Sequence, residues 1–330
     1  MFILTGATGH IGNTLARLFL AEGRPLKLLL RKSGPAVADL DCPLAFGDIF
    51  DPAFLEREVS PGDVFLHVAG MIDLTRNHRE DLFAVNEAGT RVIADFCRQR
   101  GIRLVYLSST DAIWKSDKTS FVREPDEFFP ERFRNDYSAS KAAGTAYVHE
   151  LMTNGGLDAV ILYPAAVIGP NDFKPSQAGQ EIKNSLTRRL LFYLRGGYSF
   201  IDVRDTAEAI REAAVRPLTG GYILSGHSLT IREFYETIAR ILGRKVLLVR
   251  VSALLARIGA MFMHEISPAM VDALLDNHNF DNARMRRDLL PSLRPFEETV
   301  RDTIGWFRDH PEIGNQEVSH AQSSVPPRQR

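Results

Sequence analysis

The sequence predicts an α/β protein, with a doubly wound parallel sheet and a smaller C-terminal lobe. Three observations predict this class. Strand-like and helix-like segments alternate through the first two thirds of the 330 residues, the strand-like ones are short continuous apolar runs, and a glycine-rich turn joins the first strand to the first helix. Continuous apolar runs are typical of strands that are covered on both faces, and their alternation with amphipathic helices indicates a parallel sheet.

The elements follow one another in a regular order. The strand-like runs are "FILTG", "PLKLLLR", "DVFLHVAG", "RLVYLSST" and "DAVILYP", and the helix-like stretches include "IGNTLARLFLAEG", "NEAGTRVIADFCRQRG" and "SASKAAGTAYVHELM". Gly23 and Gly101 each close a helical stretch just before a strand, as expected of residues in a left-handed C-terminal cap. The alternation loosens after Pro164.

The change of rhythm predicts the domain organisation. We assign residues 1–168 and 198–216 to the main sheet domain, because "FIDVRDTAEAIREAA" supplies a strand and a helix that can return to the main sheet. Residues 169–197 and 217–312, which include the short strand "GYILSG", form the smaller lobe, where a substrate would bind. Residues 313–330 are polar, with Pro, Gln and Ser, and are predicted to be a disordered tail.

Composition and charge limit the partners. Hydrophobic residues make up 45% and charged residues 25%, as in ordinary globular proteins. The net charge of -1 gives no whole-molecule attraction to nucleic acid or anionic lipid, so we expect a small-molecule partner, with no nucleic acid and no membrane. Cys42 and Cys97 lie far apart without metal-ligand spacing, which indicates idle thiols in a reducing compartment and no metal.

The N-terminal segment and the apolar runs bear on localisation. The first residues lack a basic n-region, and glycines interrupt any apolar core of a signal peptide. No uninterrupted apolar run reaches the roughly 18 residues that a membrane helix needs. We therefore expect a cytoplasmic protein.

The loop "TGATGHIG" indicates a nucleotide cofactor. Gly6, Gly9 and Gly12 are spaced three apart between the first strand and the first helix. Glycine in these places allows a tight turn, a close approach to a pyrophosphate and close packing of helix on strand, while the helix N-terminus faces the phosphates. The loop residues that we expect to contact the cofactor are Gly6, Thr8, Gly9, His10, Ile11 and Gly12.

The end of the second strand, "LLLRKSG", indicates which dinucleotide binds. Arg31 lies 31 − 12 = 19 residues beyond Gly12, where an acid would bind the ribose hydroxyls of NAD and a basic residue would accommodate the 2′-phosphate of NADP. Arg31 and Lys32 are basic, and the first acid is Asp39. The sequence therefore predicts NADP rather than NAD, with Arg31 as the main phosphate partner. The alternative is that these residues form a solvated loop after a strand.

The stretch "NDYSASK" places Tyr137 and Lys141 four residues apart, on one face of a predicted helix. A nearby ammonium group favours the phenolate of a tyrosine, which can then exchange a proton with a substrate oxygen. The strand "RLVYLSST" ends in Ser108, Ser109 and Thr110 at the edge of the sheet where ligands bind in open α/β folds. Thr110 is expected to donate a hydrogen bond to a substrate carbonyl; the alternative is turn chemistry after a strand.

Taken together, these motifs resemble the extended short-chain dehydrogenase/reductases over about residues 1–310. The glycine loop, "FGDIFD", "HVAG", "VNEAGT", "YLSST", "YSASK", "YPAAVIGP" and "FIDVRDTAEAI" occur in the order of that family. "YPAAVIGP" and "ETVRDTIGWFRDH" are similar to the branch that contains dihydroflavonol 4-reductase and 3β-hydroxysteroid dehydrogenase relatives. The resemblance implies a Rossmann domain, an NAD(P)-dependent oxidoreductase and a homodimer formed through the helices near 86–100 and 137–153.

The resemblance also implies residue roles. Tyr137 is the catalytic acid/base, and Lys141 lowers its pKa and binds the nicotinamide ribose. Thr110 polarises the carbonyl, with Ser109 as the fallback, and Asn86 supports the active site. The remaining cofactor contacts that we expect are Asp48 and Ile49 at the adenine, Val68, Ala69 and Gly70 lining the cleft, and Ser108, Pro164 and Val167.

Three reactions remain open. The first is NADPH-dependent reduction of an aldehyde or ketone, reversible as an alcohol dehydrogenase. The second is nucleotide-sugar epimerisation or dehydration, which is disfavoured because Tyr163 and Ala166 stand where such members carry arginine and asparagine. The third is a dinucleotide-sensing regulator, which would not need the tyrosine, lysine and hydroxyl together.

Two further groups of side chains bear on the substrate. The loop "DAIWKSDKTSFVREPDEFFPERFRN" carries Trp114, Phe121, Phe128, Phe129 and Phe133. An aromatic lining suits an apolar carbonyl substrate, although the same rings could pack the loop onto the lobe. A basic group in the lobe is either a substrate-phosphate site or a solvated face, and it consists of Lys183, Arg188, Arg189 and Arg195.

Overall fold

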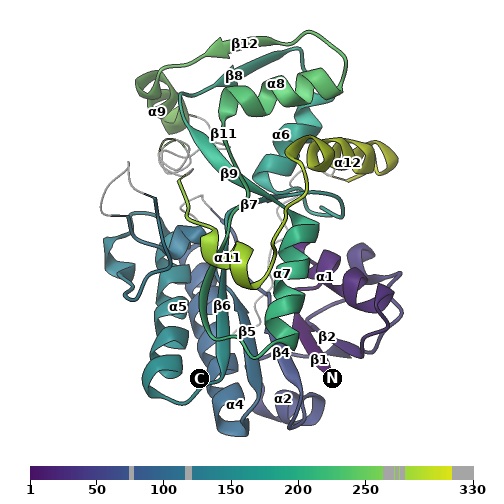
Figure 1. The fold of residues 1–330 in the computed structure, drawn as a ribbon, viewed down its shortest axis with the longest axis vertical. Helices are drawn as coiled ribbons and strands as arrows, with labels where there is room; N and C mark the ends of the chain where they lie inside the picture. The colour runs from purple at the N-terminus through teal and green to yellow at the C-terminus, as the bar shows by residue number, and fades with distance from the viewer. Residues whose placement is uncertain (74–77, 116–120, 263–270, 272–274, 276–278, 314–330) are drawn as a thin grey trace, which may run out of the picture.

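The computed structural model describes most of the chain. The described residues are 1–73, 78–115, 121–262, 271, 275 and 279–313. Figure 1 shows the main sheet domain with the smaller lobe stacked on one end of it. The predicted tail from residue 314 onward lies outside the described residues.

The main sheet has seven strands, in the order β10-β6-β5-β4-β1-β2-β3, and neighbouring strands are parallel. The strands are β1 (Phe2–Thr5), β2 (Leu26–Leu30), β3 (Leu44–Phe46), β4 (Val64–His67), β5 (Arg103–Leu107), β6 (Ala159–Pro164) and β10 (Gly220–Leu224). The chain order reverses between β1 and β4, and the carboxyl ends of the strands at such a reversal are where ligands bind in open α/β sheets. The predicted doubly wound parallel sheet is confirmed.

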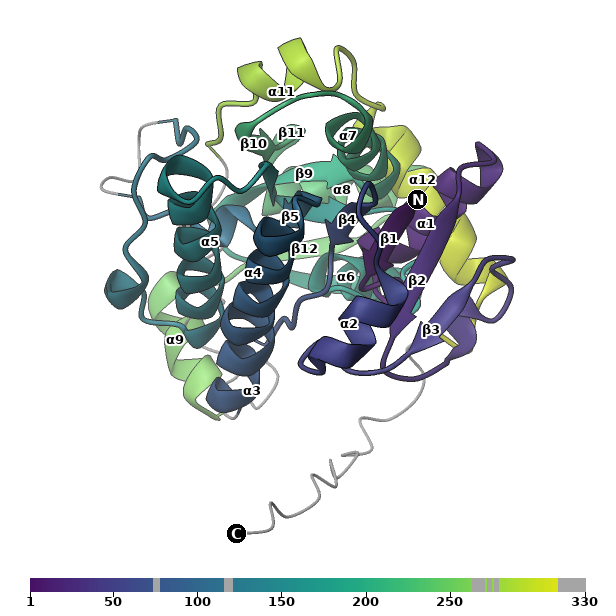
Figure 2. The ribbon, with the colours of Figure 1, turned by 90° about the horizontal axis from the view of Figure 1, so that it is seen from below.

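Helices cover both faces of this sheet (Figure 2). One face packs against α1 (His10–Ala21) and α7 (Val203–Val215), and the other against α2 (Pro52–Glu58), α4 (Thr90–Arg100) and α5 (Asp136–Asn154). The two layers form two separate apolar cores, because alternate residues of each buried strand point to opposite faces. The left-handed caps predicted at Gly23 and Gly101 are confirmed by φ angles of +64° and +62°.

The lobe contains two small sheets. The three-stranded sheet has the order β11-β9-β7, and the two-stranded sheet pairs β12 with β8. Their strands are β7 (Ala166–Ile168), β8 (Leu190–Tyr193), β9 (Gly197–Asp202), β11 (His227–Thr230) and β12 (Leu247–Arg250). They pack on α6 (Gln177–Ser185), α8 (Ile231–Ile241) and α12 (Phe296–Asp309), around stacked rings of Phe200 and Phe234 whose centroids are 4.9 Å apart.

Three strands differ from the predicted boundaries. β7, which falls within the predicted main-domain range 1–168, belongs to the three-stranded sheet of the lobe. β10, which was assigned to the lobe within 217–312, pairs with β6 and forms an edge of the main sheet. β9, which was expected to return to the main sheet within 198–216, pairs instead with β7 and β11 in the lobe, and only α7 returns. β7, β9 and β10 are short strands, and a short apolar run does not specify which sheet it joins.

Shorter elements complete the described fold. They are α3 (Arg79–Phe83), a π-helix (Ala84–Gly89), α9 (Ala253–Phe262), α11 (Ala283–Asp288) and short 3-10 helices at Pro35–Val37, Thr110–Ala112 and Pro130–Arg132. Within the described ranges, no helix is both long and apolar enough to cross a bilayer.

Candidate active site

The glycine loop lies at the carboxyl end of β1. A Cβ atom at Gly12 would lie 2.3 Å from the carbonyl oxygen of Gly6, and one at Gly6, whose φ is +84°, would lie 2.6 Å from the amide nitrogen of Ala69. Only glycine fits these two positions. Gly9 is the N-cap of α1, and among the described residues no side chain caps that helix. The amides of its first turn therefore suit a phosphate, so the loop fits the predicted dinucleotide.

His10 joins this loop to the lobe. Its Nε2 shares a hydrogen bond of 2.9 Å with the carbonyl oxygen of Pro170, and its Nδ1 lies 3.9 Å from a carboxylate oxygen of Asp172. Asp172 is buried and accepts hydrogen bonds from the backbone and hydroxyl of Ser176. Thr8 and Ile11 are partly buried in the same turn. The sequence argument missed Asp172.

The end of β2 presents Arg31 and Lys32 to solvent. The nearest acid in the sequence, Asp39, is engaged elsewhere, because Arg17 donates two hydrogen bonds to it, of 2.8 and 2.9 Å. The Arg17 guanidinium also lowers the pKa of Asp39. The positive charges of Arg31 and Lys32 are therefore not neutralised by the Asp39 carboxylate.

Asp48 and Ile49 lie in the turn after β3. The Asp48 carboxylate accepts a hydrogen bond of 3.0 Å from the amide of Phe50, which holds the turn in shape. Ile49 is partly buried beside Gly89, where an added Cβ would lie 3.2 Å from its Cδ1 atom. Both residues therefore lie at the carboxyl edge of the sheet that also carries the glycine loop, with β2 between β3 and β1.

The loop after β4 carries Val68, Ala69 and Gly70, and passes close to the side chain of Lys141. A Cβ at Gly70 would lie 2.8 Å from the Lys141 Nζ, so glycine makes room for the ammonium group. Asn86 fixes the next residue of this loop: its Oδ1 accepts from the amide of Met71, and its Nδ2 donates to the carbonyl of Met71, both at 2.9 Å.

Asn86 lies in the π-helix, a rare helix form that is frequently found at functional sites. Its Nδ2 also donates to the Ser140 hydroxyl at 3.0 Å, which links the Met71 loop to α5. A Cβ at Gly144 would lie 2.3 Å from the backbone oxygen of Asn86, so α5 can approach this closely only with glycine there. Asn86, which we expected to support the active site, makes three side-chain hydrogen bonds.

The first turn of α5 positions Tyr137 and Lys141. Asn135 caps the helix by accepting a hydrogen bond of 2.7 Å from the amide of Ser138. Both functional side chains are buried. The Lys141 Nζ donates to the carbonyl of Leu107 at 3.1 Å and lies 5.6 Å from the ring centre of Tyr106. Burial lowers the pKa of Lys141 to about 8.

The pKa of Tyr137 corrects one prediction. Burial raises it, the Asp111 carboxylate raises it further, and a hydrogen bond with Ser109 opposes the rise. The sequence predicted a lowered pKa through Lys141, which is not among the causes in this structure. The physical reason is that α5 buries the phenol and that Lys141 directs its ammonium group to Leu107.

The three hydroxyls after β5 have different partners. Thr110, the expected carbonyl donor, donates a hydrogen bond of 3.3 Å to the carbonyl of Pro164. Ser108 shares a hydrogen bond of 2.6 Å with Thr145. Ser109 is near enough to Tyr137 to oppose the rise in its pKa, and its hydroxyl accepts a hydrogen bond from the Asp111 amide at 3.1 Å. The structure therefore brings Ser109, the fallback, to the tyrosine.

The sequence argument did not select His67, a buried histidine of β4. His67 ends β4 and shares hydrogen bonds with the hydroxyls of Thr5, at 2.9 Å, and Thr90, at 3.4 Å. Its ring stacks on Tyr106 with centroids 5.9 Å apart. Burial, and then the charge of Lys141, lower the pKa of His67 to about 3, so it is neutral. The sequence did contain a signal for a buried histidine, because His67 lies within the apolar run "DVFLHVAG".

Aromatic side chains lie in the loop between the hydroxyls and Tyr137, and another comes from the lobe. Trp114 and Phe133 pack edge to face, with centroids 5.4 Å apart. Tyr198 comes from β9 of the lobe, and its pKa is raised by burial and then by the same Asp111 that acts on Tyr137. Sequence reasoning selected neither Tyr198 nor Asp111, because their proximity depends on how the lobe packs.

Other predicted aromatics lie in different surroundings. Tyr163 is buried within β6, and its ring stacks on Phe128 at 6.4 Å. Phe121 is 67% exposed. Phe128 therefore packs the loop onto the main sheet and not, as the alternative interpretation expected, onto the lobe, whereas Phe121 is exposed.

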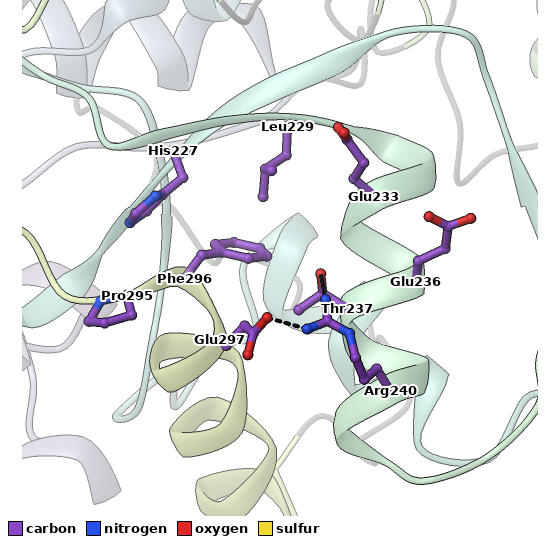
Figure 3. A pocket seen from close by; sticks show the side chains of 9 residues that line it. All are labelled: His227, Leu229, Glu233, Glu236, Thr237, Arg240, Pro295, Phe296 and Glu297. Atoms are coloured by element: carbon purple, nitrogen blue, oxygen red, sulfur yellow. Dashed lines mark hydrogen bonds and ion pairs between the residues drawn. The ribbon is translucent and has the colours of Figure 1, made fainter.

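A groove of 480 Å³ lies in the lobe (Figure 3), with Arg240 and Glu297 paired across it. It is lined by His227, Leu229, Glu233, Glu236, Thr237, Arg240, Pro295, Phe296 and Glu297. None of these residues belongs to the sheet edge with Tyr137, so the groove is separate from the reacting groups. Among the described residues, no group of three His, Cys, Asp or Glu side chains could hold a metal ion.

Comparisons with known proteins identify the family of this chain. The model of the NAD dependent epimerase/dehydratase family matches residues 2–222. Sterol demethylase protein B of Methylococcus capsulatus is 25% identical over 324 residues, covering 93% of this chain and 98% of that protein. A Synechocystis sp. protein named "Putative dihydroflavonol 4-reductase" is 31% identical over 252 residues, covering 73% and 72%.

A solved structure is also similar over nearly the whole chain. The crystal structure of gox2253 superposes with a TM-score of 0.83 at 25% identity, and covers 94% of this chain and 98% of that chain. The chain therefore belongs to the NAD-dependent epimerase/dehydratase family, and it is an NAD(P)-dependent enzyme of the extended short-chain dehydrogenase/reductase type.

Proposed function

We propose that the protein is an NADPH-dependent reductase of an aldehyde or ketone, reversible as an alcohol dehydrogenase. One observation carries the proposal: Tyr137, Ser109 and Lys141 are buried together at the carboxyl edge of the sheet, beside the glycine loop. A proton donor and a second hydroxyl at one point suit a carbonyl oxygen.

Tyr137 is the proton donor of the proposed reduction. A phenol with a raised pKa is protonated at neutral pH, so it can donate its proton to the oxygen of a carbonyl as negative charge develops there. Ser109 would hold the same oxygen. NADPH, when bound, supplies the hydride. Lys141 would contact the nicotinamide ribose, as the family resemblance implies, from its place beside Gly70.

The proposed preference for NADPH rests on the end of β2. Arg31 and Lys32 are exposed there, and Asp39 is held by Arg17. A 2′-phosphate would find two cations and no competing carboxylate from Asp39. An Arg31→Asp change should shift the preference from NADPH towards NADH.

We propose an apolar substrate. Trp114 and Phe133 pack on each other in the loop between Asp111 and Tyr137, the Asp111 carboxylate acts on Tyr198, and ligand pockets lined by aromatic side chains favour apolar molecules. The two curated relatives described above bear the names of a sterol and of a dihydroflavonol. Ketones or aldehydes on an apolar ring or chain are therefore the first compounds to test.

Epimerisation or dehydration of a nucleotide sugar is the second candidate, because the matching family model is named for these reactions. Tyr163, which stands where such members carry arginine, is buried in the sheet against Phe128. Ala166 cannot supply a polar side-chain contact. Cofactor that stays bound through purification and returns its hydride to the same substrate would favour this candidate.

The test combines cofactor titration with turnover. Fluorescence titration with NADPH and NADH gives the preference, and oxidation of NADPH against a panel of apolar aldehydes and ketones gives the activity. Tyr137→Phe should lower turnover by about 10²–10⁴-fold with NADPH affinity retained. Tyr147→Phe on the same helix, whose hydroxyl donates to Asp95 at 2.8 Å, is the matched control and should keep its activity.

Three results would contradict parts of the proposal. Full activity in Tyr137→Phe would remove the role of the tyrosine. Tight NADPH binding with no turnover on any carbonyl would favour the epimerase or dehydratase candidate, and a preference for NADH would remove the argument from Arg31.

A further inference from the structure

The two-stranded sheet of the lobe has an apolar face in water. β8 and β12 pair so that Leu190 lies beside Leu247 and Phe192 beside Val249. Side chains alternate along a strand, and Leu191 points the other way into the core of the lobe. On the outer face, Leu190, Phe192 and Leu247 are 45%, 59% and 64% exposed. A side-by-side set of exposed apolar side chains marks an interaction surface more often than scattered single ones do.

Helix α9 extends the same end of the molecule. It begins at Ala253, three residues after β12 ends, and Leu254 and Leu255 are 68% and 63% exposed. Figure 1 shows β8, β12 and α9 at the end of the lobe that lies farthest from the main sheet. We call the exposed apolar residues of these three elements, with the cations described next, the distal face.

The distal face is strongly basic. Residues 182–201 and 237–257, which contain β8, β12 and the start of α9, include no aspartate or glutamate. Their exposed cations are Arg188, Arg189, Arg195, Lys245, Arg250 and Arg257. The net charge of -1 for the whole chain therefore conceals a local excess of positive charge around the apolar side chains.

We propose that the distal face docks on the surface of an anionic lipid bilayer. Apolar side chains gain from entering the boundary between headgroups and acyl chains, and nearby lysine and arginine residues gain from anionic headgroups. The protein would lie on the membrane without crossing it. This proposal goes beyond the proposed function, because it involves none of the residues at the sheet edge.

Charge and apolar exposure favour lipid over two other occupants. A second copy of the chain would bring the same cations face to face, and like charges in contact repel. Nucleic acid would satisfy the cations, but it would leave Phe192 and the exposed leucines without an apolar partner. A bilayer with anionic headgroups satisfies both groups of side chains.

The test is co-sedimentation of the full chain with vesicles of phosphatidylcholine alone and with vesicles that also contain phosphatidylglycerol. We expect partition at least about tenfold stronger on the anionic vesicles, and weaker as salt rises. The double variants Phe192→Ser/Leu247→Ser and Arg188→Glu/Arg189→Glu should each lower it about tenfold or more. NADPH titration of each variant reports whether its main domain is folded.

Matched controls lie elsewhere on the surface. Val215→Ser removes an apolar side chain that is 42% exposed at the end of α7, and Arg57→Glu reverses an exposed charge on α2. Both should bind vesicles like the unmodified protein. If the Phe192/Leu247 double variant fails to fold, Leu254→Ser/Leu255→Ser tests the same face from α9.

Several outcomes would overturn the proposal. Equal binding to both kinds of vesicle, or equal losses in the control variants, would do so. If sedimentation velocity showed that the distal-face variants convert a dimer to a monomer without changing vesicle binding, the face would be an interface between copies. If the arginine variant lost binding to a DNA duplex while both apolar variants bound vesicles normally, the face would be a nucleic-acid surface.

Discussion

The carboxyl edge of the main sheet and the distal face of the lobe distribute their side chains in opposite ways. At the sheet edge, the polar side chains of Lys141, Asn86 and His67 are buried, and each has hydrogen-bond partners. On the distal face, Leu247 and Phe192 are apolar and exposed. Both arrangements depart from ordinary burial, and each departure indicates contact with a different kind of molecule.

The largest effect is expected in the glycine loop, where the sheet edge is packed most tightly. Gly12→Ala would place a Cβ 2.3 Å from the Gly6 oxygen, so we expect a loss of about 3 kcal/mol or more in the free energy of unfolding. Gly9→Ala is the control, because its Cβ meets nothing closer than 3.4 Å. Chemical denaturation measures both, and equal stability in the two variants would contradict this account of the loop.

Replacing Ser109 tests which hydroxyl acts at the sheet edge. Ser109→Ala should lower turnover about 10²-fold, or about 2.7 kcal/mol, by removing the donor beside Tyr137. Thr110→Val removes the hydrogen bond to Pro164 and should cost about 1 kcal/mol of stability with little effect on turnover. Steady-state kinetics and denaturation of the two variants give the answer, and the reverse pattern would return the role to Thr110.

The buried histidine makes stability depend on pH. The pKa of His67 falls from 6.5 to about 3 on folding, so below pH 6.5 the unfolded chain binds a proton that the folded chain does not. Its contribution is complete above pH 6.5 and is lost as pH falls towards 3, by at most about 1.4 kcal/mol per pH unit. Denaturation at several pH values should show a shallower slope for His67→Asn, and an unchanged slope would contradict the neutral assignment.

The smallest stability effect is expected on the distal face. Leu254→Ala should change the free energy of unfolding by no more than about 0.5 kcal/mol, because the side chain is already exposed. Leu66→Ala, a buried leucine of β4, should cost about 2–5 kcal/mol. Thermal unfolding compares the pair. A large loss in Leu254→Ala would mean that this side chain supports the lobe and does not serve as a contact surface.

Local patterns were enough to predict much of the fold and the site. Strand and helix periodicity predicted the main sheet, and residue spacing predicted that Tyr137 and Lys141 share a helix face. The sheet that β9 and β10 join was not predictable, because a short apolar run specifies a strand but not its neighbours. The choice between Ser109 and Thr110 depended on the direction of side chains one residue apart at a strand end.

The electrostatic state of the site needed the folded chain. The rise in the Tyr137 pKa depends on burial by α5 and on Asp111, and the place of Tyr198 depends on the lobe. The distal face was visible in the sequence only as a basic group at Arg188, Arg189 and Arg195. Its apolar half required the pairing of β8 with β12, which brings together residues 57 positions apart (247 − 190 = 57).

The π-helix at Ala84–Gly89 makes this site sensitive to chain length in a way that substitutions do not reveal. A π turn holds one residue more than an α turn, so deleting a single residue there would restore α geometry without breaking the helix. The flanking residues would keep nearly the same faces, but the residues inside the turn, Asn86 among them, would point in a new direction. Asn86 would then lose its hydrogen bonds to Met71 or to Ser140, although no side chain in the site had been replaced.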